Sequence, residues 1–115
     1  MNVPAYAIAE IHDLDFGPEI IEYIERIDAT LAPYGGRFIV HGGPIVPAEG
    51  EWNGDIVIIE FPDATAAEEW YASPAYQEIL PLRTEHSLSR AALLRGVPKD
   101  YRAVTKLEEL MADAG

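Results

Sequence analysis

The chain of 115 residues contains no cysteine, and this absence excludes several kinds of chemistry. Without a thiol there is no disulfide, no thiolate metal site and no cysteine nucleophile. The three histidines, His12, His41 and His86, lie far apart and show neither HxxxH nor HExxH spacing. We therefore predict no metal site and no cofactor, haem included.

Long apolar runs are also absent, since none approaches the ~20 residues that a membrane-spanning helix needs. The first residues, MNVPAYAIAE, carry neither a basic region nor a cleavage-like site that would direct export. We expect a soluble, cytoplasmic protein that has no membrane partner.

Positive charge is scarce over most of the chain. The first 82 residues hold fifteen acidic side chains against only Arg26 and Arg37, and the formal net charge of the chain is −12. Such an acidic surface repels nucleic acid and anionic lipid headgroups. Six of the eight cations lie between positions 83 and 106, where we expect them to complement acidic elements of the fold or of a second subunit.

Hydrophobic periodicity and turn residues define the expected elements. Strands are predicted over 5–12, 37–43, 55–61 and 87–96. Helices are predicted over 16–36, over 63–83 with a break near Ser73–Pro74, and over 100–115 in the tail.

Individual residues specify how these elements should pack. In the first helix the buried stripe is predicted to consist of Ile20, Ile24, Ile27 and Leu31, which recur at helical spacing. The 5–12 strand has one side of small alanines that suits close packing of a helix. The 55–61 strand, DIVIIEF, is apolar on both faces, which is typical of a central strand.

The order β-α-β-β-α-β predicts an α+β, ferredoxin-like fold with an antiparallel four-stranded sheet. We expect residues 1–97 to form this domain and residues 98–115 to form a C-terminal helical extension. Helices in this fold cover one sheet face only, and the central strand is apolar on both sides. A homodimer that pairs the two uncovered faces would bury the second side.

Several motifs occur in an order that resembles a known bacterial family. They are YGGRFIVHGG, EGEW, IIEFPDATAAEEWYASPAYQ and LRTEHS, within a region from about Tyr6 to Gly96. The sequence resembles DUF1330, a family of unknown function that is similar to the dimeric α+β barrel superfamily. The resemblance implies the ferredoxin-like fold and dimerisation through the sheets, and it implies no particular reaction.

Two glycine pairs, Gly35–Gly36 and Gly42–Gly43, flank the 37–41 stretch. A phosphate-binding loop requires a glycine-rich turn that leads into a helix through Lys-Ser/Thr, and neither pair is followed by lysine. We interpret the first pair as the left-handed end of a helix and the second as the end of a strand.

Arg37 and His41 are candidate functional residues on one strand, and strict alternation places both of them on the same face. Arg37 either pairs with a carboxylate such as Glu60 or anchors the carboxylate of a ligand. His41 either hydrogen-bonds to backbone or solvent near the strand end, or carries a proton in catalysis.

Glu60 interrupts an otherwise apolar strand, and a carboxylate in such surroundings must be paired, hydrogen-bonded or protonated. One interpretation is an ion pair with Arg37, Arg83 or Arg90. The other is a general base that faces a cavity and has a raised pKa.

The stretch EWYASPAYQ supplies a third group of candidates. Its aromatic residues either pack in the core and at the helix break, or border a pocket between the broken helix and the sheet. In the second case the ligand-binding residues would be Tyr71, Ser73 and Tyr76, together with Arg83 of the LRTEHS motif.

Two further segments carry apolar side chains that need another surface to pack on. Trp52 in the AEGEW loop either closes over a pocket or across a dimer, or covers a sheet edge. Val104, Leu107 and Met111 form one face of the tail helix, which packs on its own subunit or on a second one.

Two functions are compatible with these patterns. The first is a homodimer that binds a small anionic or aromatic metabolite between sheet and helices, with cofactor-free acid–base chemistry by Glu60 or His41. The second is a non-catalytic dimeric binding or interaction module, in which the same polar residues are purely structural.

Overall fold

Four strands form one antiparallel sheet in the order β2-β3-β1-β4 in a computed structural model that describes residues 3–114. The strands are β1 (Ala5–His12), β2 (Arg37–His41), β3 (Asp55–Phe61) and β4 (Leu88–Arg95). The expected β-α-β-β-α-β order is therefore confirmed, with β3 inserted between β1 and β2.

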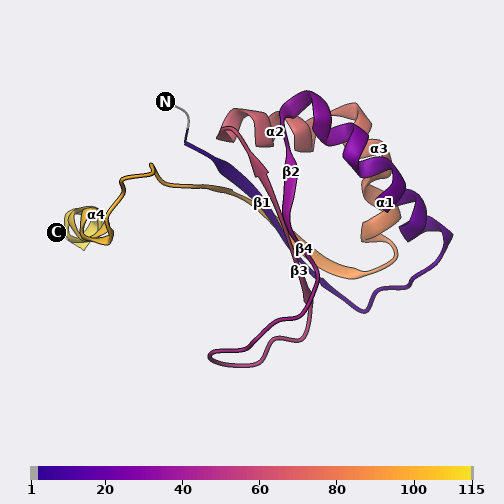
Figure 1. Cartoon of the computed structure of the whole chain (residues 1–115), viewed down its shortest axis with the longest axis horizontal. Helices are drawn as coiled ribbons and strands as arrows, with labels where there is room; N and C mark the ends of the chain where they lie inside the picture. Colours follow the sequence, from indigo (N-terminus) through magenta and orange to yellow (C-terminus); the bar gives the residue numbers. More distant parts are fainter. Residues whose placement is uncertain (1–2, 115) are drawn as a thin grey trace.

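Three α-helices cover one face of the sheet, and a fourth lies apart on the other side (Figure 1). They are α1 (Pro18–Leu31), α2 (Ala64–Ala72), α3 (Pro74–Thr84) and α4 (Ala103–Ala114), with a 3₁₀ turn η1 (Ala32–Tyr34) after α1. Within residues 3–114, no helix combines the length and apolarity required to cross a bilayer.

Local sequence signals explain where the helices begin and end. Pro18 occupies the first turn of α1, where the missing N–H costs nothing, and Gly35 adopts φ +68° after η1. Asp63 caps α2 by accepting a 2.8 Å hydrogen bond from the Ala66 N–H. The predicted break at Ser73–Pro74 is confirmed, because α2 ends there and α3 begins with Pro74 at its first turn.

The core lies between the helices and the covered sheet face. Its buried members come from β1, α1, β3, α2 and α3 and are Ala5, Ile27, Leu31, Ile59, Phe61, Ala67, Trp70, Tyr76 and Ile79. The indole N–H of Trp70 donates a 3.0 Å hydrogen bond to the Thr30 hydroxyl, which keeps this buried donor satisfied.

The prediction of the buried stripe on α1 is wrong at one position. Ile20, Ile27 and Leu31 are buried as expected, but the Ile24 side chain is 46% exposed. Tyr23 instead lies half-buried between Ile20 and Ile27, because the spacing i, i+3, i+7 places it closer to the centre of the inward face.

The other face of the sheet is uncovered by the described part of the chain. Its apolar residues, Ile8, Ile58 and Leu94 among them, are half-buried or exposed, so β3 is central but deeply buried on one side only. This face also carries charge: Glu10 pairs with Arg90 across β1 and β4 at 3.0 Å.

Helix α4 confirms the predicted tail helix and buries none of its residues. Val104, Leu107 and Met111, the predicted apolar face of this helix, are exposed, and no other part of the described chain covers them. The loop 42–54 projects on the same side of the sheet as α4 (Figure 1).

Gly36 provides a test of the core packing. A Cβ at this position would lie 2.7 Å from Cε1 of Phe61 and 2.8 Å from Cδ2 of Leu31, both fully buried. We expect Gly36→Ala to lower the free energy of unfolding by about 1–3 kcal/mol, measured by urea denaturation, because an overfilled core must shift. Gly17→Ala is the control, since its Cβ would meet only an oxygen of Glu19 at 3.6 Å. Equal stability of the two variants would contradict the packing described here.

Candidate functional site

A cavity of about 580 Å³ lies between the covered face of the sheet and helices α1 and α3. Its floor includes the small side chains Ala7, Ala9 and Ala91, which leave room where larger residues would touch the helices. The alanine side of β1 predicts close packing of a helix on this strand. Ala5 is packed in the core as predicted, whereas Ala7 and Ala9 provide space for the cavity.

The cavity wall is mostly apolar, with few polar groups. These come from five elements and are Tyr23, His41, Asp55, Tyr71, Tyr76 and Arg83. A volume of this size with sparse, convergent polar groups is typical of a small-molecule site.

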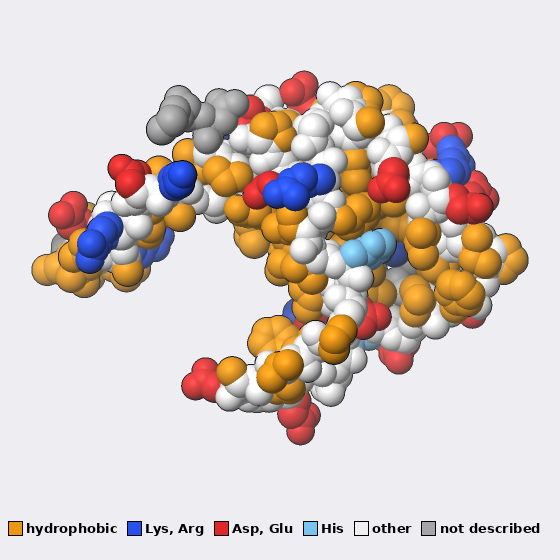
Figure 2. All heavy atoms as spheres, in the orientation of Figure 1, with side chains coloured by type: hydrophobic (Ala, Val, Ile, Leu, Met, Phe, Trp, Pro, Cys, Tyr) orange, Lys and Arg blue, Asp and Glu red, His pale blue; other side chains and the backbone are white. Residues whose placement is uncertain are grey.

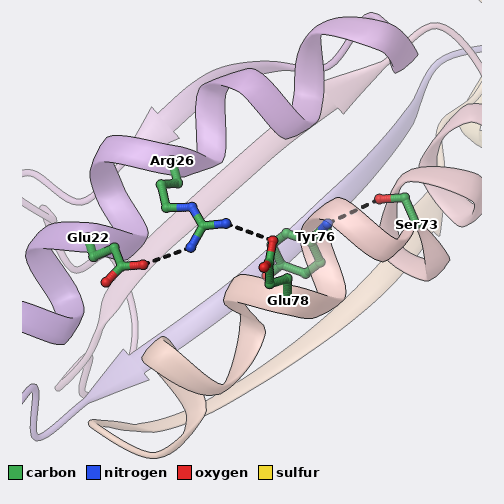
Figure 3. Close-up of polar contacts among 5 residues, drawn as sticks. All are labelled: Glu22, Arg26, Ser73, Tyr76 and Glu78. Atoms are coloured by element: carbon green, nitrogen blue, oxygen red, sulfur yellow. Dashed lines mark hydrogen bonds and ion pairs between the residues drawn. The ribbon is translucent and has the colours of Figure 1, made fainter.

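An ion-pair bridge on the outer surface joins the two helices that border the cavity. Arg26 of α1 donates 2.7 Å hydrogen bonds both to Glu22 on its own helix and to Glu78 on α3 (Figure 3). These exposed pairs contribute little to stability individually, but they link α1 to α3 above the cavity.

Two tyrosine hydroxyls meet at the cavity wall. The Tyr23 and Tyr76 oxygens lie 2.8 Å apart and the rings pack edge to face, with centroids separated by 6.2 Å. Burial is the main reason why the pKa of Tyr23 is raised well above its ordinary value, and Tyr76 adds to this effect. Tyr23 therefore stays protonated and able to donate a hydrogen bond at neutral pH.

Arg83 is the buried charge of the site, with only 5% of its surface exposed. It extends from the last turn of α3, and Nη1 donates a 2.6 Å hydrogen bond to the Ser89 hydroxyl of β4. The guanidinium carbon lies 5.9 Å from the centroid of the Tyr23 ring, within cation–π range. Burial opposes the charged form, but Tyr76 and Tyr23 outweigh it and raise the pKa of Arg83, so the cation persists.

No carboxylate of residues 3–114 forms an ion pair with Arg83. Buried charges in proteins are normally paired, since desolvation without a counter-charge is costly. A buried guanidinium held by one hydroxyl and an aromatic ring at the wall of an apolar cavity is therefore chemically suited to receive an anion.

His41 reaches the cavity through an irregularity in β2. Phe38 pairs with Ile59 and His41 pairs with Val57, so three steps along β2 match two steps along β3, with the shift between Phe38 and Val40. This bulge places His41 on the same side as Phe38, and the two rings stack with centroids 4.3 Å apart. The prediction that His41 shares a face with Arg37 is therefore wrong, because strict alternation fails at a bulge.

Arg37 and Glu60 lie away from the cavity. They are cross-strand neighbours on β2 and β3, where Arg37 Nε and Nη2 contact the same Glu60 oxygen at 3.0 and 2.9 Å. Neither residue is part of the cavity lining. Of the alternatives considered for Glu60, the structure contains the ion pair with Arg37.

Ser73 is buried between α2 and α3, and its hydroxyl acts as both donor and acceptor in hydrogen bonds to backbone groups. The hydroxyl donates a 2.7 Å hydrogen bond to the Trp70 carbonyl. It also accepts a 3.3 Å hydrogen bond from the Tyr76 N–H, which Figure 3 shows. Tyr71 and Tyr76 line the cavity, whereas Ser73 does not. Its position is that of a helix cap at the break.

His12 and His41 are kept apart by β3, as the expected strand order requires. Nε2 of His12 lies 2.9 Å from the Glu10 carboxylate on the uncovered sheet face, and this hydrogen bond is the main reason why the pKa of Glu10 is lowered. Among residues 3–114, no group of three or more His, Asp or Glu side chains is placed to hold a metal ion.

Sequence reasoning missed Tyr23 and Phe38 as site residues. Tyr23 carried a usable signal, since it lies three residues after Ile20 and four before Ile27. Phe38 carried none, because its role depends on the bulge that brings His41 to the same face.

Comparison with known families settles the classification of the chain. Residues 4–97, which include every residue of the cavity lining, match the family described as a domain of unknown function, DUF1330. The chain belongs to the DUF1330 family. Helix α4 lies beyond the matched part of this DUF1330 protein. No curated protein matches the chain.

Solved structures share the fold of this DUF1330 protein at low sequence identity. A dimeric ferredoxin-like protein of unknown function from Jannaschia sp. CCS1 has a TM-score of 0.63 at 14% identity, covering 79% of this chain and 97% of that one. A protein of unknown function from Rhodopseudomonas palustris has a TM-score of 0.57 at 19% identity, with 85% of each chain covered. The cofactor-independent oxygenase SnoaB from Streptomyces nogalater has a TM-score of 0.52 at 17% identity, with 87% and 97% covered. The ferredoxin-like architecture predicted from the sequence is confirmed by these similarities.

The buried Tyr23 hydroxyl predicts a pH dependence of stability. Because the pKa is raised in the folded state, the contribution of this group is complete below the ordinary tyrosine pKa of about 10 and is lost as the pH rises further. We expect the free energy of unfolding of the wild type to fall more steeply than that of Tyr23→Phe between about pH 9 and pH 11.

Urea denaturation at a series of pH values measures this difference. Tyr101→Phe, a change outside the cavity lining, is the control and should follow the wild type. Parallel pH profiles for the wild type and Tyr23→Phe would show that the Tyr23 hydroxyl is not held in the protonated form by its surroundings.

Proposed function

We propose that this DUF1330 protein is a homodimer that binds a small organic acid with an aromatic or alicyclic body in the cavity of each subunit. The observation that carries the proposal is Arg83, a buried cation on the lining that pairs with no carboxylate of the described chain. The ligand carboxylate would supply the missing counter-charge.

The surroundings of Arg83 support a carboxylate more than a phosphate. Arg83 already uses Nη1 on Ser89, and the adjacent donors are the Tyr23 and Tyr76 hydroxyls. One cation flanked by neutral donors suits a single negative charge, whereas a phosphate dianion usually attracts several cations or a helix N-terminus. The carboxylate on the lining, Asp55, is exposed on β3 and is separated from Ser89 by Ile11 of β1. The apolar lining suits the hydrocarbon part of the ligand.

The shape of the cavity also limits the ligand. His41, Val57, Ala9 and Ala91 form one row of paired residues from one edge strand of the sheet to the other. Three strand spacings of about 4.8 Å make this row roughly 14 Å wide. Aromatic rings of Tyr71, Tyr76 and Phe38 face this space and provide stacking surfaces for a flat ring system.

His41 is the residue that we assign to acid–base chemistry in this site. Its imidazole lines the cavity and stacks on Phe38, and an imidazole can both accept and donate a proton. Glu60, the other candidate base, is paired with Arg37 on the opposite face of the sheet and has no place in this proposal.

Dimerisation through the uncovered sheet face completes the proposal. Ile8, Ile58 and Leu94 on this face lack a covering layer within the described chain. Proteins of the same fold from Jannaschia sp., Thermobifida fusca and Bacteroides fragilis are described as dimeric. Pairing two such faces would bury both of them.

The second candidate function is a dimeric module without a ligand. It is favoured by the structural roles of three predicted site residues, since Arg37 and Glu60 pair with each other and Ser73 caps α3. This alternative does not account for the buried charge of Arg83, so the decisive experiment concerns that residue.

Binding of 2-naphthoate tests the proposal, with its uncharged analogue 2-naphthamide as the reference probe. We expect naphthoate to perturb the amide resonances of cavity residues in an NMR titration and naphthamide to bind at least 10-fold more weakly. In Arg83→Met the affinity for naphthoate should fall roughly 10- to 100-fold, since a hydrogen-bonded charge contributes about 1.5–3 kcal/mol.

Arg37→Met is the matched control, because it removes an arginine of the same chain from outside the cavity and should leave naphthoate binding unchanged. Equal binding of naphthoate and naphthamide to the wild type would contradict the carboxylate site, even if Arg83→Met fails to fold. Absence of binding by both probes would favour the ligand-free module. A monomeric mass in light scattering would contradict the dimer.

A further inference from the structure

Two segments extend beyond the sheet on its uncovered side. One is the loop 42–54, and the other is the arm, residues 96–114, which consists of a linker and helix α4 (Figure 1). Figure 2 shows them as two projections with a hollow between them, and hydrophobic side chains line the wall of that hollow. The shape is that of a clamp over the uncovered sheet face.

Both projections expose apolar side chains at unusual levels. In the loop, Val46 is 90% exposed and Trp52 is 52% exposed, and the Trp52 N–H donates a 3.0 Å hydrogen bond to the Glu49 carbonyl within the loop itself. In the arm, Leu107 and Met111 belong to an exposed stripe along α4. Apolar patches of this kind mark surfaces that contact another molecule.

The first residues of the arm carry cations, and the loop carries carboxylates. The linker side of the arm carries Lys99 and Arg102, neither of which forms an ion pair within the described residues. The loop carries Glu49 and Glu51, also without an ion pair in the part of the chain described, and it contains no lysine or arginine. The two cations at the start of the arm suit this acidic, apolar loop. The arm as a whole is not basic, since it holds Lys99, Arg102 and Lys106 against Asp100, Glu108, Glu109 and Asp113.

Within one copy these segments start from opposite ends of the sheet. The arm follows Arg95, which lies opposite Ala5, whereas the loop precedes Asp55, which lies opposite Ile11 at the other end of β1. A two-fold axis between facing sheets that reverses the strand direction would bring the arm of each copy to the loop of the other. The contact would then occur twice, as an isologous interface requires.

We propose that the arm of each subunit packs on the 42–54 loop of a second copy, with the Leu107–Met111 stripe against Trp52 and Val46. This inference rests on the homodimer proposed above and specifies its geometry. The linker cations face Glu49 and Glu51 of the second copy. Each arm then closes one end of the hollow above the paired sheets.

The absence of cysteine makes a direct test simple, since one introduced thiol carries a single spin label. Met111→Cys carrying a nitroxide is mixed with an equal amount of ¹⁵N-labelled wild type, so that paramagnetic broadening reports only contacts between copies. We expect amide signals of the 42–54 loop to lose more than half of their intensity. The control is Glu25→Cys with the same label, on the outward side of α1, which should leave those signals intact.

Light scattering on the same mixture separates this inference from the proposed dimer. A dimeric mass with broadening confined to α4, or with none, would overturn the contact between arm and loop and leave the dimer standing. A monomeric mass would overturn both. Broadening of the loop in a dimeric sample supports the inference.

A second pair of variants tests the energetic role of the stripe. Leu107→Glu should raise the dimer dissociation constant at least 10-fold in analytical ultracentrifugation. Thr105→Glu adds the same charge about a half-turn away from the centre of the stripe and should leave the constant within two-fold. Equal effects of the two substitutions would count against packing of this face on a second copy.

Discussion

A four-stranded sheet has two faces, and helices α1, α2 and α3 cover only one of them. This imbalance organises the rest of the molecule. The covered side contains the core, because the helices pack on it there. It also contains the cavity, because the alanines of β1 and β4 leave space between the sheet and the helices. The uncovered side keeps apolar strand residues half-exposed and holds its charged groups at the surface, between two projecting segments.

The charged residues on the two sides of the sheet differ in how their charge is compensated. On the uncovered face charges are neutralised locally, by Arg37 with Glu60 and by Arg90 with Glu10. On the covered face Arg83 is held by a hydroxyl and an aromatic ring in surroundings that penalise an isolated charge. Paired charges at an exposed surface are common and contribute modestly, whereas the buried Arg83 carries a desolvation cost that no carboxylate of residues 3–114 offsets.

The architecture was predictable because it depends on local patterns. The alternation in β1, the glycine after η1 and the Ser73–Pro74 break specify element boundaries through the chain's own backbone chemistry, and the structure confirms them. The site was less predictable. Strict alternation predicts that Arg37 and His41 share a face, and a single irregularity in β2 separates them. Tyr23 and Arg83 meet through α1 and α3 packing, a contact between distant segments that no local pattern encodes.

The bulge in β2 has a consequence for how DUF1330 sequences should be aligned. Odd- and even-numbered residues exchange faces across it, so in a member aligned without a gap the residue beneath His41 faces the cavity only if the bulge is kept. In an equally long strand that alternates regularly, that residue would lie on the uncovered face instead. A strand that is one residue shorter, aligned with a gap at position 39, would keep its last residues on the same faces as here, so identity at this column is informative only when the strand length is counted with it.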